Sequence, residues 1–336
     1  MRKVFYLSLT LFVLLILIVL FRNSSDSLES NTIRIGYNAE SLYHGPIILA
    51  NEMGIFEKNG LEVEMIPIKS AKETQQALSV GAIDVGSAGA TNFFISISKG
   101  APVKIIAPLA SSPTQIFVRP NELKSIKELS GKTIASQRGG ASNLALGYAL
   151  KNENVSLDSV EFVDIEKSVR PIALMNKKIV DAVAAGEYEE KIYSDHGAVL
   201  LEEWKTLGYT NKSFPRTVIA VNTDFIASNK ESVGIFIDSV IESQNFINDH
   251  PDEAALIISK HMKDNSEGII DFSLEDILES WKTLHYVIWY DSQELLKLST
   301  LAYDIGDLDS LLSIEQIFDN SFKDKLMEGQ NEVYAP

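Results

Sequence analysis

The amino-acid sequence contains one pattern of predicted strands and helices twice, and this duplication restricts the fold more than any other feature. The first copy spans residues 33–89 and the second spans residues 132–186. In each copy, apolar strand-like stretches alternate with helix-like stretches in the order β-α-β-α-β, and an Ile/Val-Asp motif opens the third strand. Alternation of this kind forms parallel βαβ units with right-handed crossovers. The sequence therefore predicts an α/β protein with two lobes, each a mainly parallel sheet with helices on both faces.

Two further strand-like runs flank the second copy and are predicted to cross between the lobes. The first run ends near Phe117 and the second returns near Thr217, after which the pattern becomes helical. Two crossing strands form the hinge that closure around a ligand requires. The predicted organisation is lobe one at 32–117, lobe two at 118–217, and completion of lobe one by C-terminal helices at 218–330.

The N-terminal residues 1–22 predict a signal anchor or a signal peptide. Arg2 and Lys3 precede an apolar run that extends to Phe21. This run is long enough to cross the hydrocarbon core, and no A-x-A-like cleavage site follows it. We therefore favour an uncleaved transmembrane helix over a removed peptide, followed by a Ser-rich tether at 23–31. The remainder is expected on the extracytoplasmic face of the membrane, because the basic residues keep the N-terminus inside.

Composition excludes several classes of function. The formal net charge is -16, which argues against a nucleic-acid partner. The chain has no cysteine, so it has no thiolate metal site, no cysteine nucleophile and no cysteine for lipid attachment. The five histidines show no metal-binding spacing, and motifs for nucleotide binding or a nucleophilic serine are absent. The sequence predicts binding without catalysis, cofactor or metal.

Four loops at equivalent positions of the two copies form the predicted ligand site, namely 40–45, 86–91, 139–143 and 186–188. Ligands of open α/β sheets bind beyond the carboxyl ends of the strands, where helices begin. Two arginines near these loops suit an anion. The candidate ligand-binding residues are Ser41, Tyr43, His44, Ser87, Gly89, Ala90, Thr91, Arg138, Gly140, Ala141, Ser142, Asn143, Glu187, Tyr188 and Arg216.

Simpler explanations exist for several of these residues. Helix capping alone explains Ser142 and Asn143, and solvation at the surface explains each arginine equally well. Glu187 suits an amine on the ligand or a salt bridge across the hinge. The convergence of the four loops is what favours a binding site.

Four stretches, taken in order, resemble the nitrate/sulfonate/taurine group of ABC-transporter substrate-binding proteins over residues 32–325. They are IRIGYN, GIFEKNGLEVEMIPIKSAKETQQALSVGAIDVGSAGATN, KSIKELSGKTIASQRGGASNLAL and HPDEAALIISKH. The resemblance implies a type II periplasmic-binding-protein fold and delivery of ligand to a membrane permease with a cytoplasmic ATPase. It also implies that the loops 86–91 and 139–143 supply most polar contacts. Residues 41–44 would cover the ligand from lobe one, and residues 187–188 would face it from lobe two.

The function predicted from the sequence is that of an extracytoplasmic solute-binding protein of an ABC importer. Its ligand is expected to be a small anionic organic molecule of the sulfonate, taurine or nitrate kind. Two alternatives remain open. One is an extracytoplasmic ligand sensor that signals to a partner through its anchor. The other is a protein that binds or synthesises a pyrimidine precursor of thiamine on the same fold.

Overall fold

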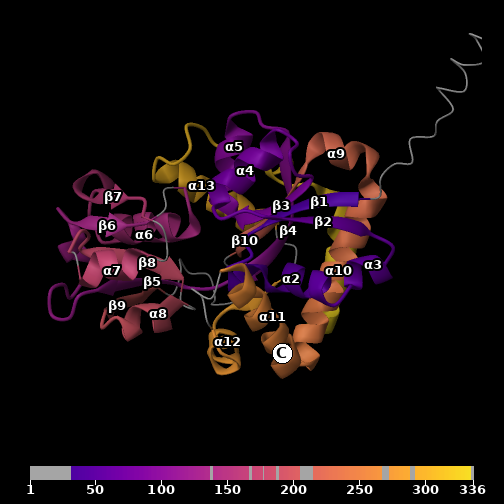
Figure 1. Ribbon diagram of the computed structural model, residues 1–336. Helices are drawn as coiled ribbons and strands as arrows, with labels where there is room; N and C mark the ends of the chain where they lie inside the picture. Colours follow the sequence, from indigo (N-terminus) through magenta and orange to yellow (C-terminus); the bar gives the residue numbers. More distant parts are fainter. Residues whose placement is uncertain are drawn as a thin grey trace, which may run out of the picture.

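The computed structural model describes residues 32–136, 139–165, 169–176, 178–186, 189–204, 215–266, 272–287 and 292–333. The predicted anchor at 1–22 and the tether at 23–31 lie outside these ranges. Within them, no helix combines the length and the apolar character that a membrane span requires. The strands form two separate sheets with helices around each (Figure 1).

The first sheet has six strands in the order β11-β4-β10-β3-β1-β2. Strand β3 is parallel to β1, which is parallel to β2, whereas β10 is antiparallel to both of its neighbours, β3 and β4. Strand β11 pairs antiparallel with β4 at the edge. The bounds are β1 (Thr32–Tyr37), β2 (Glu62–Pro67), β3 (Val85–Gly89), β4 (Val103–Ser111), β10 (Pro215–Asn222) and β11 (His285–Tyr286).

The second sheet repeats this arrangement in the order β7-β6-β8-β5-β9. Strands β7, β6 and β8 are parallel neighbours, and β5 lies antiparallel between β8 and β9. The bounds are β5 (Thr114–Val118), β6 (Thr133–Ala135), β7 (Glu161–Val163), β8 (Ala182–Gly186) and β9 (Val199–Trp204). The duplicated pattern is thus confirmed. The sequence did not predict the direction of β5 and β10. Each of these strands runs antiparallel to both of its neighbours in an otherwise mainly parallel sheet.

The aspartate of the duplicated motif has the same structural role in both copies. One carboxylate oxygen of Asp84 accepts the backbone N–H of Arg34 at 2.9 Å, and one of Asp181 accepts the backbone N–H of Thr133 at 3.0 Å. The Arg34 guanidinium also pairs with Asp84. Each aspartate therefore joins the start of the third strand to the start of the first, which explains the recurrence of the motif without a role in binding.

Strand β8 shows why helices cover both faces of the second sheet. Ala182 and Ala184 belong to one core cluster with residues of α6, and Val183 and Ala185 belong to another with residues of α7 and α8. Successive side chains of a strand point to opposite faces, so an apolar run without alternation is buried on both.

The helices have the following bounds: η1 (Leu42–His44), α2 (Gly45–Glu52), α3 (Ile55–Lys58), α4 (Ala71–Ser79), α5 (Ala90–Ser98), η2 (Ile126–Leu129), α6 (Ala141–Asn152), η3 (Leu157–Ser159), α7 (Arg170–Met175), α8 (Glu190–Asp195), α9 (Thr223–Ser228), α10 (Lys230–Asp249), α11 (Pro251–Asn265), α12 (Leu274–Ser280), α13 (Ser292–Asp304), α14 (Ile314–Ile317), η7 (Asn320–Phe322) and α15 (Lys323–Val333).

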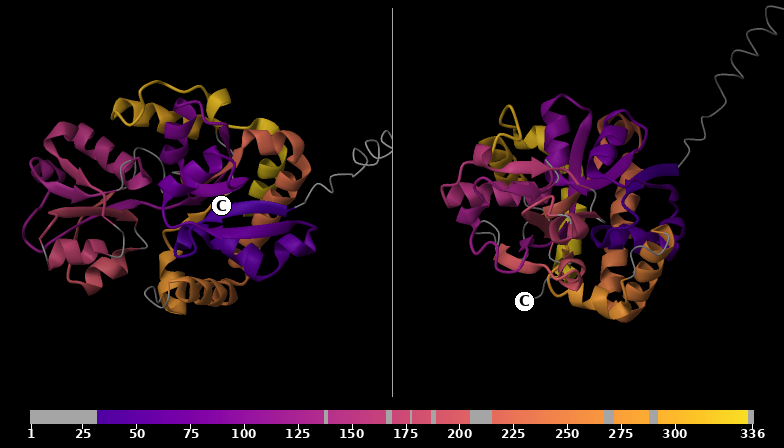
Figure 2. Two further views of the ribbon diagram at one scale, coloured as in Figure 1. Left: turned by 45° about the horizontal axis from the view of Figure 1, so that its top comes forward. Right: turned by 60° about the vertical axis from the view of Figure 1, so that its left-hand side comes forward.

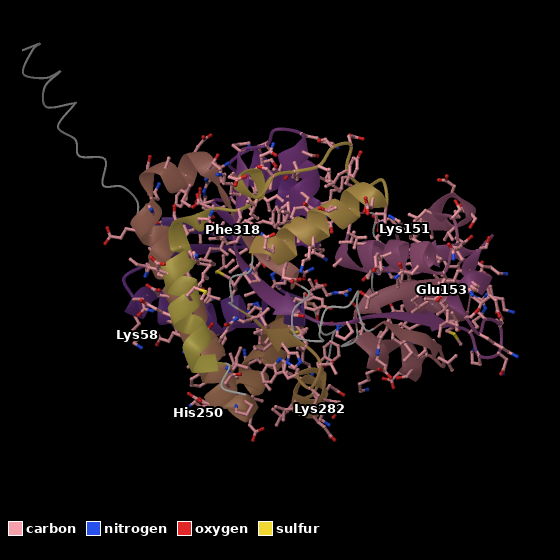
Figure 3. All side chains as sticks on the ribbon, turned by 180° about the vertical axis from the view of Figure 1, so that it is seen from behind. Lys58, Lys151, Glu153, His250, Lys282 and Phe318 are labelled. Atoms are coloured by element: carbon pink, nitrogen blue, oxygen red, sulfur yellow. The ribbon has the colours of Figure 1, made fainter. Side chains whose placement is uncertain are left out.

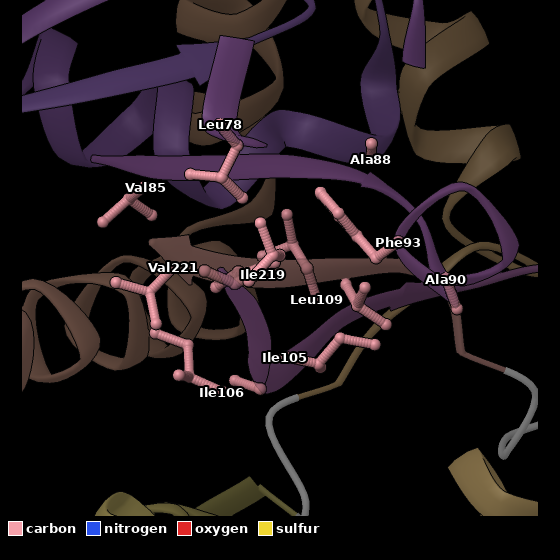
Figure 4. Packing of buried hydrophobic residues seen from close by; sticks show 14 of the residues in the cluster. Leu78, Val85, Ala88, Ala90, Phe93, Ile105, Ile106, Leu109, Ile219 and Val221 are labelled. Atoms are coloured by element: carbon pink, nitrogen blue, oxygen red, sulfur yellow. The ribbon is translucent and has the colours of Figure 1, made fainter. Parts of the chain in front are cut away.

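We call the first sheet with its covering helices lobe one, and the second sheet with α6, α7 and α8 lobe two. The core of lobe one joins neighbouring strands, as Val85, Ile219 and Ile105 show (Figure 4). The C-terminal helices also contribute to this core, among them Leu298 of α13 and Ile317 of α14. Both sheets are therefore built around buried apolar clusters that tie them to their helices.

The chain passes between the lobes twice. It leaves β4 at Ser111 and enters β5 at Thr114, so Ser112 and Pro113 form the first crossing. It leaves the second sheet after β9 and returns with β10 (Figure 2). The lobe boundaries predicted at 117/118 and 217/218 fall inside β5 and β10, and the first crossing, at Ser112 and Pro113, comes just before β5.

Candidate functional site

Two helices begin at the junction of the lobes, one from each lobe. Strand β3 ends at Gly89, which is the N-cap of α5, and Gly140 is the N-cap of α6. A Cβ atom added at Gly89 would lie 3.8 Å from the backbone nitrogen of Ala141. Neither helix has a side-chain hydrogen bond at its cap. Helix N-termini carry unpaired N–H groups and partial positive charge, so their convergence favours an anion at this place.

Arg216, at the start of β10, adds a full positive charge to the junction. Its side chain is buried, and Nη1 donates to Thr114 Oγ1 at 2.6 Å and to the carbonyl of Pro113 at 3.4 Å. Nη2 donates to the hydroxyl of Ser142 in α6. The guanidinium carbon lies 5.3 Å from the centroid of the Tyr43 ring. Arg216 thus contacts the first crossing, lobe two and the loop after β1.

No carboxylate pairs with Arg216 among the residues that the structure describes. The comparison with Arg119 is informative, because that side chain is equally buried but pairs with Glu122 at 2.7 Å and with Asp181 at 3.2 Å. A buried charge without a counter-charge is costly. The guanidinium has five N–H donors, and three hydrogen bonds to neutral groups leave two for another acceptor.

Tyr43 brings the lobes into direct contact. Its hydroxyl lies 3.1 Å from Ser112 Oγ, which in turn donates to the carbonyl of Pro113 at 3.1 Å. A Cβ atom at Gly186, the last residue of β8, would lie only 2.1 Å from the Tyr43 hydroxyl oxygen. Only glycine fits at position 186 in this arrangement. Tyr43 of lobe one therefore closes over the end of β8 in lobe two.

Several buried polar atoms at or near the junction have no hydrogen-bond partner within the described ranges. Unsatisfied buried polar groups are uncommon and call for an explanation such as a ligand. Asn92 is notable, because its Oδ1 would lie 3.0 Å from a Cβ at Gly89, beside the start of α6. The atoms are Ser87 Oγ, Asn92 Oδ1, Gln115 Oε1, Ser136 Oγ and Asn143 Oδ1.

Five of the predicted residues meet at the junction: Tyr43, Gly89, Ala141, Ser142 and Arg216. Gly140 caps α6 beside them, and Asn143 donates from Nδ2 to Asp307 at 3.3 Å. The others that the structure describes are buried after β1, in β3 or at the start of α5, namely Ser41, His44, Ser87, Ala90 and Thr91. Arg138, Glu187 and Tyr188 lie outside the described residues. Binding by any of these side chains stays a prediction.

Sequence reasoning missed the polar residues at the first crossing and at the start of β5 as candidates for the site. Ser112, Thr114 and Gln115 are buried, and two of them hydrogen-bond to Tyr43 or Arg216. The available signal was the polar stretch SSPTQ between two apolar strands. Elsewhere, the described residues contain no group of three or more His, Asp or Glu that could hold a metal ion.

Comparison with known proteins places this geometry in a wider group. Residues 41–254 match the family model described as NMT1/THI5 like. A protein of Brucella abortus (strain 2308) named as a binding protein is 28% identical over 272 residues, which cover 80% of this chain and 79% of the relative. A protein of Haemophilus influenzae named as a thiamine biosynthesis protein is 23% identical over 218 residues, covering 63% and 67% of the two chains.

Solved structures with the same fold include two with stated ligands. The alkanesulfonate-binding protein of Xanthomonas axonopodis pv. citri bound to MOPS has a TM-score of 0.71 at 17% identity, over 86% of this chain and 98% of that chain. The nitrate-binding protein of Synechocystis PCC 6803 has a TM-score of 0.73 at 17% identity, over 92% and 90% of the two chains. These matches confirm the predicted periplasmic-binding-protein fold and the resemblance to the sulfonate and nitrate group.

Proposed function

The chain belongs to the NMT1/THI5-like family, and from this premise we propose that it is an extracytoplasmic solute-binding protein of an ABC importer. It captures a small anionic organic molecule between its lobes and delivers it to a membrane permease with a cytoplasmic ATPase. The proposed location is supported by solved proteins of this fold that are named as periplasmic, such as the nitrate-binding protein of Synechocystis PCC 6803. Attachment to the membrane through residues 1–22 is part of the proposal.

The observation that carries the proposal is the buried guanidinium of Arg216 without a carboxylate partner in the described part of the chain. Two of its N–H groups have no acceptor among the described residues, and together with the starts of α5 and α6, which have no side-chain cap, they suit one oxyanion. Hydrogen bonds that involve an ionised group are stronger than neutral ones. A sulfonate, carboxylate or nitrate therefore fits this junction better than a neutral molecule does.

Binding without catalysis is the simpler account of the junction. Ser112, Thr114 and Ser142 supply hydroxyl groups, but no hydrogen bond that the structure describes joins any of these three to a histidine or a carboxylate. A nucleophilic hydroxyl needs a base within hydrogen-bonding distance. The solved relatives of this fold are likewise named as binding proteins.

Thermal unfolding of the full chain in mild detergent tests the proposal. The panel contains taurine, alkanesulfonates, MOPS, nitrate and dicarboxylates, with 4-amino-5-hydroxymethyl-2-methylpyrimidine as a neutral competitor. A ligand that binds only the native state raises the unfolding midpoint by roughly 5 °C at about 100 times its Kd. A shift with one class of anion supports the proposal. If neutral ligands alone shift the midpoint, the anionic assignment is wrong.

The second candidate is binding of a pyrimidine precursor of thiamine. The relative of Haemophilus influenzae favours it by name. The side-chain oxygens of Ser87, Asn92 and Asn143 also favour it, because they have no hydrogen-bond partner in the described part of the chain and suit a ring with neutral donors. A midpoint shift with the pyrimidine and with no anion would support this candidate.

A ligand sensor is distinguished from an importer component by co-purification, because only an importer component brings a permease and its ATPase with it.

A further inference from the structure

One face of α6 packs into the core of the opposite lobe. Ala141 and Leu144 belong to the apolar cluster of lobe one, and Leu144 is 1% exposed. Leu146, two residues further along the same helix and also 1% exposed, belongs to the separate cluster of lobe two. The helix therefore joins two cores, and any motion that separates the lobes along this face would expose Leu144 to water.

Helix α13 and the turn after it supply the lobe-one side of this contact. A Cβ atom at Gly147 would lie 2.9 Å from Cδ1 of Ile305, so the backbone of α6 approaches that side chain closely. Lys151 at the end of α6 pairs with Asp304 at 3.2 Å, and Figure 3 shows Lys151 beside the end of the neighbouring helix. We call Ala141, Leu144, Gly147 and Ile305 the α6–α13 seam.

On the other side of the crossing strands, the contact between the lobes is weaker in the part of the chain that the structure describes. Lys191 of α8 lies 3.9 Å from Asp276 of α12, and Ile192 is only partly buried against lobe one. Exposed ion pairs contribute little to stability, whereas burial of a whole leucine side chain contributes much more. We call Lys191, Ile192 and Asp276 the α8–α12 rim.

We propose that the α6–α13 seam stays closed in the ligand-free protein and that the lobes separate at the α8–α12 rim, which is the entry route to Arg216. The inference rests on the proposed function, because it concerns the opening that admits a ligand. Because α6 packs into the cores of both lobes, the hinge between the lobes is restricted to motions that keep the Leu144 face of α6 buried. The seam then acts as a fixed contact beside the two crossings.

Distances between pairs of nitroxide labels in the ligand-free full chain test this inference. The chain contains no cysteine, so introduced cysteines are labelled without background. The seam pair is Asn152→Cys with Tyr303→Cys, and the rim pair is Ser194→Cys with Glu275→Cys, all at exposed positions. The pair Asn152→Cys with Ser194→Cys lies within lobe two and is the reference.

We expect a distribution for the seam pair as narrow as that of the reference, and a longer, broader distribution for the rim pair. Any other combination overturns the inference, whether the seam pair broadens or the rim pair stays narrow. Since no ligand is added, the result can be read even if no compound binds, which keeps this test separate from that of the proposed function.

Two substitutions on α6 examine the cause. Leu144→Ser removes apolar burial at the seam, and Leu146→Ser removes equal burial inside lobe two. We expect Leu144→Ser to broaden the seam distribution and Leu146→Ser to lower stability without broadening it. If Leu144→Ser fails to fold, Ile305→Ser replaces it, because Ile305 is only partly buried. Equal broadening in the seam variant and in Leu146→Ser would show that the seam has no special role.

Discussion

Substitution of Arg216 by methionine separates a binding role from a structural role. The variant removes the buried charge and the two N–H groups for which the described residues provide no acceptor. Hydrogen bonds from a charged donor contribute about 1.5 to 3 kcal/mol each, so the loss of two weakens anion binding by about 3 kcal/mol or more. This corresponds to roughly a hundredfold increase in Kd. The free energy of unfolding should change by only about 1 kcal/mol, because an unpaired buried charge leaves together with its hydrogen bonds.

Arg119→Met is the matched control. Arg119 is as buried as Arg216, but its partners are Glu122, Asp181 and the carbonyl groups of Leu174 and Val180. Removal of these contacts should lower the free energy of unfolding by about 2 to 4 kcal/mol and leave the Kd unchanged. The two buried arginines are therefore expected to show opposite patterns.

The assay is isothermal titration of both variants with the anion that gives the largest midpoint shift, combined with urea unfolding. The expected result is loss of affinity with near-normal stability for Arg216→Met, and the reverse for Arg119→Met. If Arg216→Met binds the anion within about threefold of the original protein, less than 1 kcal/mol in binding free energy, the guanidinium is not a ligand contact. Destabilisation of both variants to the same extent would show that Arg216 is a structural residue.

Three further outcomes are expected. Gly186→Ala should prevent closure of the lobes, because its Cβ would lie 2.1 Å from the Tyr43 hydroxyl oxygen. Ligand binding should then be lost while the circular dichroism spectrum stays unchanged. Normal binding would contradict the contact between Tyr43 and position 186. Burial, with a smaller effect of the Glu52 charge, raises the pKa of Tyr37 from 10.0 to about 12. The unfolded chain loses the Tyr37 proton near pH 10 and the folded chain near pH 12, so the free energy of unfolding falls by about 2 to 3 kcal/mol between these two pH values. In urea unfolding, Tyr37→Phe should reduce this fall of stability with pH. Asp84→Asn should lower stability by about 1 to 3 kcal/mol through weaker bonds to Arg34, measured by urea unfolding, with no effect on Kd.

The fold was predictable where the local pattern carries the information. The apolar run of β8 indicates a strand buried on both faces, and the repeated Ile/Val-Asp motif marks equivalent strands in the two copies. The insertion of β10 between β3 and β4 was not predictable, because its pairing partners lie far away in the sequence and no local periodicity encodes them. The anchor proposed for residues 1–22 stays a prediction.

The position of the candidate site could be predicted, because ligands of open α/β sheets bind beyond the carboxyl ends of the strands. The side-chain contacts within the site could not be predicted. Arg216 could be chosen as a cation near a predicted loop, while its partners Thr114 and Ser142 are 102 and 74 residues away along the chain. Gly186 could be placed in a predicted loop, yet the reason for a glycine there is Tyr43, a neighbour from elsewhere in the fold. Side-chain partners of this kind depend on the tertiary structure.

The position of β10 also determines the order in which the lobes can be completed during synthesis. All five strands of the second sheet lie within residues 114–204, so lobe two can finish its sheet from one continuous segment. Strands β3 and β4 are made early, but each is hydrogen-bonded to β10 rather than to the other, and β10 ends only at Asn222. Their facing edges therefore have no partner until the other lobe has been made, and unpaired edges favour aggregation. Lobe two should fold first, and lobe one is the part of the nascent chain that most needs protection by chaperones.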